Sequence, residues 1–289
     1  MRLLIIGASG VLGSRLYNDV IKRKWNVLGT YFSQECEGLF YLDLKDRKTV
    51  DKIFNFFKPE VVVCAGGITD VDLCEKRPRL AREVNVSGTL HLVRKIKEYD
   101  AKFVFLSTDY VFDGKNGPYS EETSPCPINI YGKTKLEGEA IVRDSLDDFL
   151  IVRTAQLYGV DHRNRNFAVE IIRNMQNNKK VYAADDFYCT PTYVGTLSEA
   201  IVKLIKSDKR GIFNVAGSDF LHRYAYISLI SDIFSLDKSL IQKLKLKDLH
   251  LKAARPRKAG LKIDKLVKEI KIKPLNCKDG LKLLRKEMS

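Results

Sequence analysis

A tyrosine and a lysine lie four residues apart in the segment Tyr131-Gly132-Lys133-Thr134-Lys135. In a helix, residues at this spacing project from one face, so the phenol and the ammonium would lie side by side. An ammonium next to a phenol lowers the phenol pKa from its ordinary value of about 10. The pair predicts that Tyr131 protonates a carbonyl oxygen during a reduction and that Lys135 also holds a nicotinamide ribose. An exposed, inert Tyr/Lys pair is the alternative, because this spacing is common by chance.

A polar stretch upstream favours the catalytic interpretation. Ser107 to Gly114 directly follows the apolar run Phe103 to Leu106, which is typical of a buried strand. Ligands of open parallel sheets bind at the carboxyl ends of strands, where this stretch would lie. We therefore expect Thr108 to donate a hydrogen bond to the same carbonyl oxygen, which makes Thr108, Tyr131 and Lys135 the predicted catalytic set.

A glycine-rich turn near the N-terminus predicts a dinucleotide site. Gly7, Gly10 and Gly13 follow the apolar run Arg2 to Ile6 and open a segment with helical periodicity. Glycines at this spacing let a strand turn sharply into a helix and bring the backbone close to a pyrophosphate. The predicted phosphate contacts are Gly7, Ser9, Gly10, Val11, Leu12 and Gly13.

The end of the second predicted strand favours NADP over NAD. This strand ends Gly29-Thr30-Tyr31-Phe32-Ser33, without the carboxylate that would bind the ribose 2′-hydroxyl of NAD. Thr30 and Ser33 are candidate donors to a 2′-phosphate. Asp43, followed by Leu44, is placed either to approach the adenine or to cap the next helix.

The elements that must position these residues alternate between strand and helix. Strands are expected at 2–6, 26–30, 39–42, 61–64, 103–106, 149–152 and 211–215, and helices at about 49–57, 86–99, 130–143 and 193–205. This alternation predicts an α/β fold, a Rossmann-type doubly wound parallel sheet with a smaller C-terminal substrate lobe. The predicted dinucleotide-binding domain comprises 1–156 plus about 193–216, and the lobe about 157–192 plus 217–289.

Composition excludes several other classes of protein. The chain has 289 residues, of which 45% are hydrophobic and 30% charged, and no apolar run is long enough to span a membrane. Six scattered cysteines predict reduced thiols and no metal site. The net charge of +14 lies mostly in residues 236–289, on the expected solvated faces of helices, so no nucleic-acid partner is predicted. We expect a cytoplasmic protein.

These motifs together resemble the dTDP-4-dehydrorhamnose reductases, a family of extended short-chain dehydrogenases/reductases. The matching segments span almost the whole chain, and the most specific are Ser107 to Gly114 and Tyr131 to Glu139. The resemblance implies reduction of the 4-keto group of a deoxysugar nucleotide by NADPH or NADH, with dTDP-4-dehydrorhamnose as the expected substrate. Some family members form a magnesium-bridged homodimer, but no residue cluster here requires one.

The resemblance also implies further site residues. Ala65, Gly66 and Gly67 would border the cofactor, and the expected substrate contacts are Thr69, Thr108, Asp109, Tyr110, Gln156 and Arg255. Some of these have structural alternatives: core packing for Tyr110, turn formation for Asp109, an ordinary surface position for Arg255. Asn85, in another matching segment, is either functional or a buttress of a helix terminus.

Three departures from the family pattern leave the substrate open. Gln156 stands where a family reductase typically has tryptophan, and Phe187 lies in a changed Asp-Gln-x-Gly-x-Pro-Thr segment. The usual Arg-Pro-x-Asn-Ser segment is also changed, at residues 255–259. A reductase or epimerase acting on another nucleotide sugar is therefore a second hypothesis. A third is a non-catalytic, dinucleotide-binding subunit like the regulatory subunit of methionine adenosyltransferase, which belongs to the same family.

Overall fold

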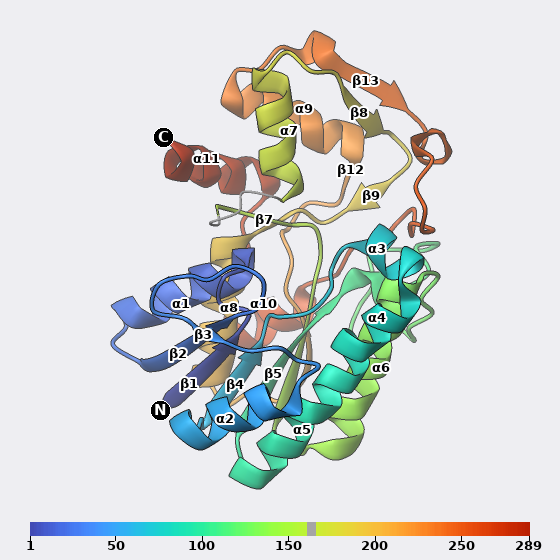
Figure 1. Ribbon diagram of the computed structural model, residues 1–289. Helices are drawn as coiled ribbons and strands as arrows, with labels where there is room; N and C mark the ends of the chain where they lie inside the picture. Colours follow the sequence, from blue (N-terminus) through green and yellow to red (C-terminus); the bar gives the residue numbers. More distant parts are fainter. Residues whose placement is uncertain (161–165) are drawn as a thin grey trace.

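The computed structural model describes residues 1–160 and 166–289. Its centre is a parallel sheet of seven strands in the order β11-β6-β5-β4-β1-β2-β3 (Figure 1). The bounds of these strands, in chain order, are β1 Arg2–Ile6, β2 Asn26–Tyr31, β3 Phe40–Tyr41, β4 Val61–Cys64, β5 Lys102–Thr108, β6 Phe149–Thr154 and β11 Gly211–Asn214. The order reverses between β1 and β4, and the crevice outside their carboxyl ends is where such sheets bind ligands.

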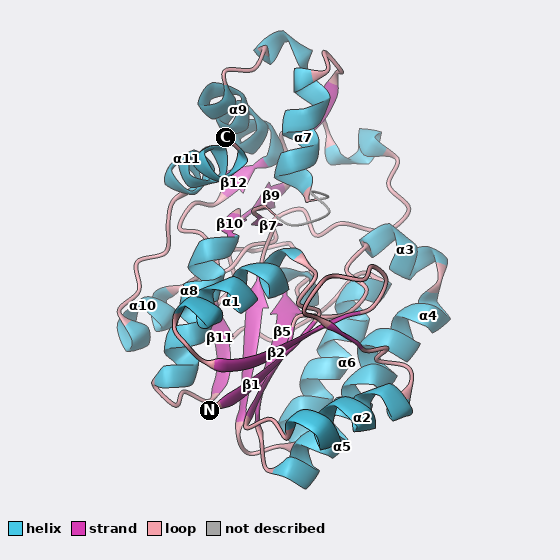
Figure 2. Cartoon of the chain, turned by 60° about the vertical axis from the view of Figure 1, so that its left-hand side comes forward, coloured by secondary structure: helices cyan, strands magenta, loops and turns pink. Residues whose placement is uncertain are grey.

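Helices cover both faces of the sheet (Figure 2). One face carries α1 (Val11–Lys22), α8 (Val194–Lys206) and α10 (Asp264–Ile270), and the other α2 (Arg47–Phe57), α5 (Gly88–Tyr99) and α6 (Ile130–Ser145). Alternate strand residues separate accordingly: Leu3 and Ile5 enter the core beneath α1, whereas Leu4 and Ile6 enter the core beneath α2 and α5. This two-fold periodicity explains why each central strand is an unbroken apolar run, since both of its faces are buried.

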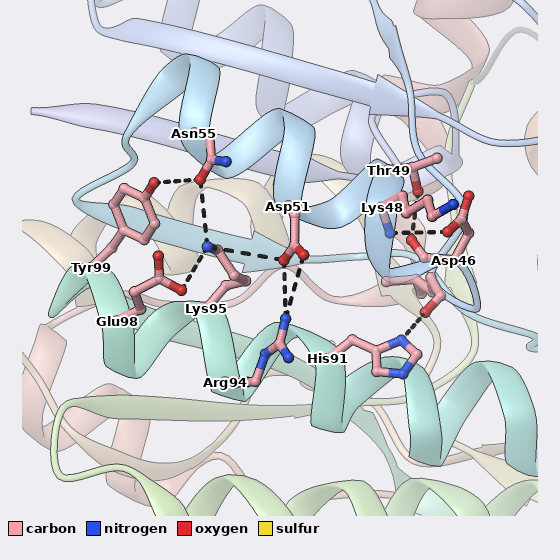
Figure 3. A network of polar contacts seen from close by, with 11 residues as sticks. Asp46, Lys48, Thr49, Asp51, Asn55, His91, Arg94, Lys95, Glu98 and Tyr99 are labelled. Atoms are coloured by element: carbon pink, nitrogen blue, oxygen red, sulfur yellow. Dashed lines mark hydrogen bonds and ion pairs between the residues drawn. The ribbon is translucent and has the colours of Figure 1, made fainter.

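Polar contacts as well as apolar packing hold α2 against α5 (Figure 3). Asp51 on α2 pairs with Arg94 on α5 at 3.2 Å, and the Tyr99 hydroxyl donates to Asn55 Oδ1 at 2.7 Å. Lys95 is only 4% exposed, and its ammonium is neutralised by Glu98 at 2.6 Å and by Asp51 at 3.9 Å. These contacts fix the register of two helices on the face of the sheet away from α1.

The remaining elements form a second layer beyond the carboxyl ends of the strands (Figure 1). They are β7 Leu157–Tyr158, α7 Phe167–Gln176, β8 Val181–Ala184, β9 Tyr188–Cys189, β10 Thr192–Tyr193, β12 Leu221–His222, α9 Arg223–Phe234, β13 Ile241–Leu244 and α11 Cys277–Met288, with 3₁₀ turns η3 Lys238–Leu240 and η4 Leu246–Leu249. Helices α9 and α11 pack on each other, and β13 pairs with β8. Part of the predicted lobe, residues 161–165, lies outside the described residues.

The α/β, doubly wound parallel fold predicted from the sequence is confirmed. The predicted strands at 2–6 and 61–64 coincide with β1 and β4, and the other predicted sheet strands differ from the observed ones by one or two residues at an end. The predicted division into domains stays a prediction. Helix α10 falls inside the predicted lobe range but lies beside α8 and β11, because buried Leu266 and Ile270 join the core on that face.

The helix expected at about 86–99 is present, but the helical stretch begins earlier. After the short helix α3 (Val71–Lys76), α4 (Pro78–Arg82) continues through the π-helical turn η1 (Glu83–Ser87) into α5, which begins at Gly88. Asp70 caps α3 by accepting from Leu73 N, and Pro78 occupies the first turn of α4. Both are local signals that the apolar periodicity does not contain. In the described part of the chain, no helix has the length and apolarity needed to cross a membrane.

Candidate functional site

The glycine turn is built by close backbone contacts. Gly7 ends β1 with φ +81°, a left-handed conformation that favours glycine. Its N–H donates to the Thr30 hydroxyl at 3.2 Å, and its carbonyl accepts from Gly10 N at 3.1 Å. A Cβ at Gly13 would lie 2.1 Å from the Gly7 carbonyl oxygen, so helix α1 can start here only if residue 13 is glycine.

The N-terminus of α1 fits a bound pyrophosphate. Gly10 is the N-cap residue and offers no side chain to the free N–H groups of the first turn, which also contains no acidic residue. Ser9, Val11 and Leu12 complete this turn around the start of the helix. Unpaired N–H groups at a helix N-terminus attract anions, so these residues would hold the phosphates of a dinucleotide.

The opposite rim of the crevice is the loop after β4, residues Ala65 to Gly67. A Cβ at Gly7 would lie 2.8 Å from Gly66 N, so this loop and the glycine turn touch. Asn85 anchors the loop: its Oδ1 accepts from Ile68 N at 2.9 Å, and its Nδ2 donates to Ile68 O and to Thr134 Oγ1. Asn85 is thus a buttress that ties the loop to α6.

Asp43 does not cap a helix, so that alternative is wrong. Its Oδ1 accepts from Lys45 N at 2.9 Å within a tight turn, and Asp46 caps α2 by accepting from Lys48 N. Leu44 is buried, and its side chain lies beside Gly66 at the crevice. The proposed contact of Asp43 with adenine stays a prediction.

The loop after β2 carries two carboxylates that the analysis of residues 29–33 did not include. Thr30 is buried and braces the glycine turn, whereas Ser33 is exposed. Beyond Ser33, Glu35 and Glu37 line a cavity of about 500 Å³ together with Tyr17. Donors for a 2′-phosphate are therefore accompanied by two carboxylates, and the preference for NADP over NAD stays a prediction.

Helix α6 places Tyr131 and Lys135. Asn129 caps it by accepting from Gly132 N at 2.8 Å, while its Nδ2 donates to Ala254 O at 2.9 Å. A Cβ at Gly132 would lie 2.1 Å from Tyr110 O, so the first turn of α6 packs directly on the 3₁₀ turn η2 (Asp109–Val111). The rings of Tyr131 and Tyr110 meet edge to face, with centroids 5.9 Å apart.

The expectation that Tyr131 has a lowered pKa is wrong for the protein without cofactor. Burial raises the pKa of Tyr131, and the Asp109 charge adds to this effect while the Thr108 hydroxyl opposes it. Burial also lowers the pKa of Lys135, whose Nζ lies 4.1 Å from the centroid of the Phe105 ring. Removal from water is the largest influence on both pKa values, so Tyr131 is a neutral phenol that still carries its proton.

Lys135 extends from α6 towards the crevice at the carboxyl ends of β1 and β4. Its charge opposes the rise in the pKa of the Cys64 thiol, at the carboxyl end of β4 beside β1. Among the described residues, the ammonium lies over the Phe105 ring, and no hydrogen bond contributes to its pKa. The ammonium is therefore placed to bind a group at the point where the strand order reverses.

Thr108 and Asp109 end strand β5 as a coupled pair. The Thr108 hydroxyl donates to Asp109 Oδ1 at 3.2 Å and accepts from Tyr110 N at 3.2 Å. Burial raises the pKa of Asp109 to about 7, against the opposing effects of Thr108 and of the Arg223 charge. The Asp109 carboxyl is a buried acceptor beside Thr108, not merely a turn-former.

A buried ion pair that the sequence analysis did not find holds this edge together. Arg153 on β6 donates two hydrogen bonds to Glu139 on α6, from Nη2 to Oε2 at 2.7 Å and from Nε to Oε1 at 2.9 Å. The Ser107 hydroxyl also donates to Glu139 Oε1, at 2.5 Å. Both charged residues are almost completely buried. These contacts join α6 to β5 and β6, and they therefore fix the position of Tyr131 relative to Thr108. Spacing alone cannot reveal a pair that forms across two elements.

The remaining predicted substrate residues lie around this centre. Thr69 is exposed in the loop before α3, and Gln156 follows β6 with a left-handed φ of +37°. Arg255 is bound at both guanidinium ends by Asp72, at 3.1 Å each, and also donates to Ala253 O. Its contact with a diphosphate stays a prediction, because in this structure the Arg255 guanidinium is paired with the Asp72 carboxylate. Within the described ranges, no cluster of metal-ligating side chains is present.

A Rossmann-type sheet, a glycine turn and a buried Thr/Tyr/Lys set at the adjoining strand ends define a short-chain dehydrogenase/reductase architecture. The family model described as RmlD substrate binding domain matches residues 1–289. The chain belongs to this family, that of the dTDP-4-dehydrorhamnose reductases.

Solved structures and curated relatives agree with this assignment. A dTDP-4-dehydrorhamnose reductase of Clostridium acetobutylicum superposes with a TM-score of 0.91 at 29% identity, covering 100% of this chain and 99% of that one. The corresponding Bacillus anthracis reductase, in complex with NADP, gives 0.90 at 26%, covering 99% of each chain. Among curated proteins, the "Methionine adenosyltransferase 2 subunit beta" of Xenopus tropicalis is 31% identical over 82% of this chain and 73% of its own. A relative from Haloferax volcanii named "Probable low-salt glycan biosynthesis reductase Agl14" is 29% identical over 100% of this chain and 99% of its own.

Proposed function

We propose that the protein reduces the 4-keto group of a deoxysugar nucleotide, with dTDP-4-dehydrorhamnose as substrate, dTDP-L-rhamnose as product and NADPH as reductant. The observation that carries this proposal is the convergence of Thr108, Tyr131 and Lys135 at the strand ends next to the glycine turn. A protein that only bound a dinucleotide would have no need of a buried proton donor. The likeness to reductases over the whole chain supports the same conclusion.

The residues of the crevice fit the dinucleotide. The first turn of α1 would hold its phosphates, the 65–67 loop would border the nicotinamide half, and Lys135 would bind the adjoining ribose. When bound, NADPH supplies the hydride equivalent that reduces the carbonyl carbon.

The chain itself supplies the proton and its control. In the free protein, Asp109 Oδ1 accepts the single hydroxyl proton of Thr108 and so holds its side chain. When substrate binds, the hydroxyl turns this proton to the carbonyl oxygen and polarises it. Tyr131, kept neutral by burial, delivers its proton to the same oxygen as negative charge develops there. The Lys135 ammonium stabilises the phenolate that Tyr131 becomes, an effect that grows as charge appears in a buried site.

A single substitution tests the proposal. Tyr131→Phe removes the proton donor and keeps the ring that packs on Tyr110, so the kcat for NADPH oxidation with dTDP-4-dehydrorhamnose is expected to fall by about 10²–10⁴-fold. The dissociation constant of NADPH, followed by its fluorescence, is expected to stay within about threefold. Turnover by Tyr131→Phe at the wild-type rate would contradict the proposed role of the phenol.

A regulatory subunit is the second candidate, and it is favoured by the likeness to methionine adenosyltransferase subunits beta. On this hypothesis the protein binds a dinucleotide and acts through a catalytic partner. It predicts NADPH binding without turnover of any keto-sugar nucleotide, together with a changed rate of a methionine adenosyltransferase on mixing. Turnover that disappears in Tyr131→Phe excludes it as the sole function.

A further inference from the structure

Arg223 brings a positive charge from the second layer to the edge of the catalytic site. It is the first residue of α9, and its backbone N–H donates to Phe187 O at 2.8 Å. Its guanidinium carbon lies 4.1 Å from the ring centroid of Phe167 and 4.9 Å from that of Phe187. Two aromatic rings on different segments therefore fix the side chain in place.

Gln156 holds the same guanidinium from the side of the sheet. Arg223 Nη2 donates to Gln156 Oε1, and the Gln156 carbonyl accepts from Thr192 N at 3.1 Å. Thr154 on β6 pairs with Thr108 on β5, and Gln156 comes two residues after Thr154. Gln156 therefore lies just beyond the strand end that carries Thr108. Its left-handed φ of +37° is costly for a residue other than glycine, and such strain is retained where the surroundings require it.

One nitrogen of this guanidinium lacks an acceptor. Arg223 Nη1 is buried and has no hydrogen-bond partner among the described residues. The Arg223 charge is nevertheless close enough to lower the pKa values of Asp109 and Tyr110 against the effect of burial. A buried guanidinium nitrogen without an acceptor is unfavourable, and a bound ligand that supplies an oxygen removes the penalty.

The chemistry around Arg223 favours a hydroxyl group as this ligand. Nη1 is a donor only, whereas the neighbouring Asp109 carboxyl is an acceptor when ionised. A hydroxyl accepts from one and donates to the other. An anionic group would gain from Arg223 but would be repelled by ionised Asp109, so it fits this pair less well.

We propose that Arg223, positioned by Gln156, is a substrate-binding residue that donates a hydrogen bond to a ring hydroxyl of the sugar. The inference rests on the proposed function and specifies how the sugar is recognised at that site. The guanidinium and the amide provide a polar contact at the position where a family reductase typically presents tryptophan. Recognition there depends on a sugar oxygen and not on aromatic stacking.

The test compares Arg223→Met with wild type in two assays. Methionine keeps an unbranched apolar chain between the two rings but removes the donors. We expect the KM for dTDP-4-dehydrorhamnose to rise about 10–100-fold, the loss that corresponds to one hydrogen bond from a charged group, with kcat changed less than threefold. In calorimetry with NADP⁺ present, binding of dTDP-L-rhamnose is expected to weaken by a similar factor. Arg223→Lys keeps the charge, and its KM and its affinity for dTDP-L-rhamnose should lie between those of wild type and Arg223→Met.

Deoxy analogues show whether the lost contact is with the sugar. In wild type, removal of the recognised hydroxyl, tested with the 2-deoxy and 3-deoxy forms of dTDP-L-rhamnose, should weaken binding at least tenfold. In Arg223→Met the same removal should cost less than threefold, because the donor is already absent. If removal of each hydroxyl weakened binding by the same factor in wild type and in Arg223→Met, the proposal would be overturned and the role of Arg223 would be structural.

Controls separate this inference from the proposed function. Arg173→Met, an exposed arginine on α7 in the same layer, should leave KM and dTDP-L-rhamnose binding unchanged. Arg223→Met values equal to those of this control would overturn the proposal. If wild type turns over no keto-sugar nucleotide, the proposed reductase activity fails. Calorimetry with dTDP-L-rhamnose still tests Arg223 in that case. The Arg223 proposal is overturned if wild type does not bind dTDP-L-rhamnose, or if Arg223→Met binds it as tightly as wild type does.

Discussion

At the scale of single residues, burial has a larger effect on the pKa values of the proposed catalytic groups than the charges beside them. Tyr131, Lys135 and Asp109 are each shifted towards the neutral form by removal from water. The proposed role of Tyr131 requires this state, because a proton donor must still carry its proton when the carbonyl oxygen becomes negative. The Tyr/Lys spacing correctly brings both residues into one buried site, but the expected lowering of the phenol pKa requires a site less desolvated than this one.

Asp109 makes the stability of the protein depend on pH. Its folded-state pKa of about 7 lies above the ordinary value of 3.8, so the neutral form is favoured by folding. The resulting contribution to the free energy of unfolding is fully present below about pH 4 and is lost as pH rises through about 7. A shift of this size corresponds to about 4 kcal/mol.

Urea unfolding of wild type and Asp109→Asn measures this contribution. Between pH 4 and 7.5 the free energy of unfolding of the wild type should fall relative to that of Asp109→Asn, by up to about 4 kcal/mol. All other titrating groups are common to both proteins and cancel in the difference. Parallel stability curves over this range would show that Asp109 ionises with an ordinary pKa.

At the scale of elements, glycines decide how closely the backbone segments of the site approach. The turn from β1 to α1 depends on Gly13, the contact between α6 and η2 on Gly132, and in both cases a Cβ would lie 2.1 Å from a carbonyl oxygen. The sequence pattern identifies the first of these because it recurs wherever a strand turns into a phosphate-binding helix. The second has no such pattern, because the carbonyl it approaches is 22 positions away in the chain.

Gly13→Ala tests the close approach directly. The added Cβ cannot be accommodated unless α1 moves away from β1, so NADPH binding is expected to weaken by at least 10-fold, with a loss of about 1–3 kcal/mol of stability. Fluorescence titration with NADPH and thermal unfolding measure the two effects.

Gly38→Ala is the matched control for this change. Gly38 has φ +75°, but a Cβ there would meet no atom within 4 Å. This variant should therefore show only the cost of the left-handed backbone and keep its NADPH affinity within about twofold. Equal losses of affinity in both variants would mean that steric contact with the Gly7 carbonyl is unimportant.

At the scale of the whole molecule, the site lies where two layers meet. The sheet supplies the glycine turn, Thr108 and Tyr131, and the second layer supplies Arg223 and the rings that hold it. The tail connects the layers: Ala253 N donates to Asp72 Oδ1, and Ala254 O accepts from Asn129, the N-cap residue of α6. Basic residues concentrated in this tail give the molecule a charge that favours anionic ligands.

Cofactor preference is a property that thermal unfolding of the intact protein can report. A ligand that binds only the folded state stabilises it by about 2.7 kcal/mol at 100 times its dissociation constant. We expect NADPH at 1 mM, about the concentration ordinarily used in such assays, to raise the Tm more than NADH does. The carboxylates of Glu35 and Glu37 line the cavity beyond Ser33 and oppose a 2′-phosphate there, so Glu35→Gln should widen the difference in Tm shift between NADPH and NADH. A larger shift with NADH would reverse the predicted preference.

The sequence by itself predicted the parallel sheet and the glycine turn, which the structure confirms, and it pointed to Thr108, Tyr131 and Lys135, which the structure buries at adjoining elements. These features depend on short-range patterns: unbroken apolar strands, glycines at fixed spacing, and side chains one helical turn apart. Only the tertiary structure decided that Asp46 and not Asp43 caps α2, that Glu139 and Arg153 pair beneath the site, and that Arg223 reaches its edge. The physical reason is that caps depend on backbone geometry, and buried pairs join residues that become neighbours only when helices and strands pack. The pKa values of the catalytic groups likewise follow from burial, which no spacing specifies.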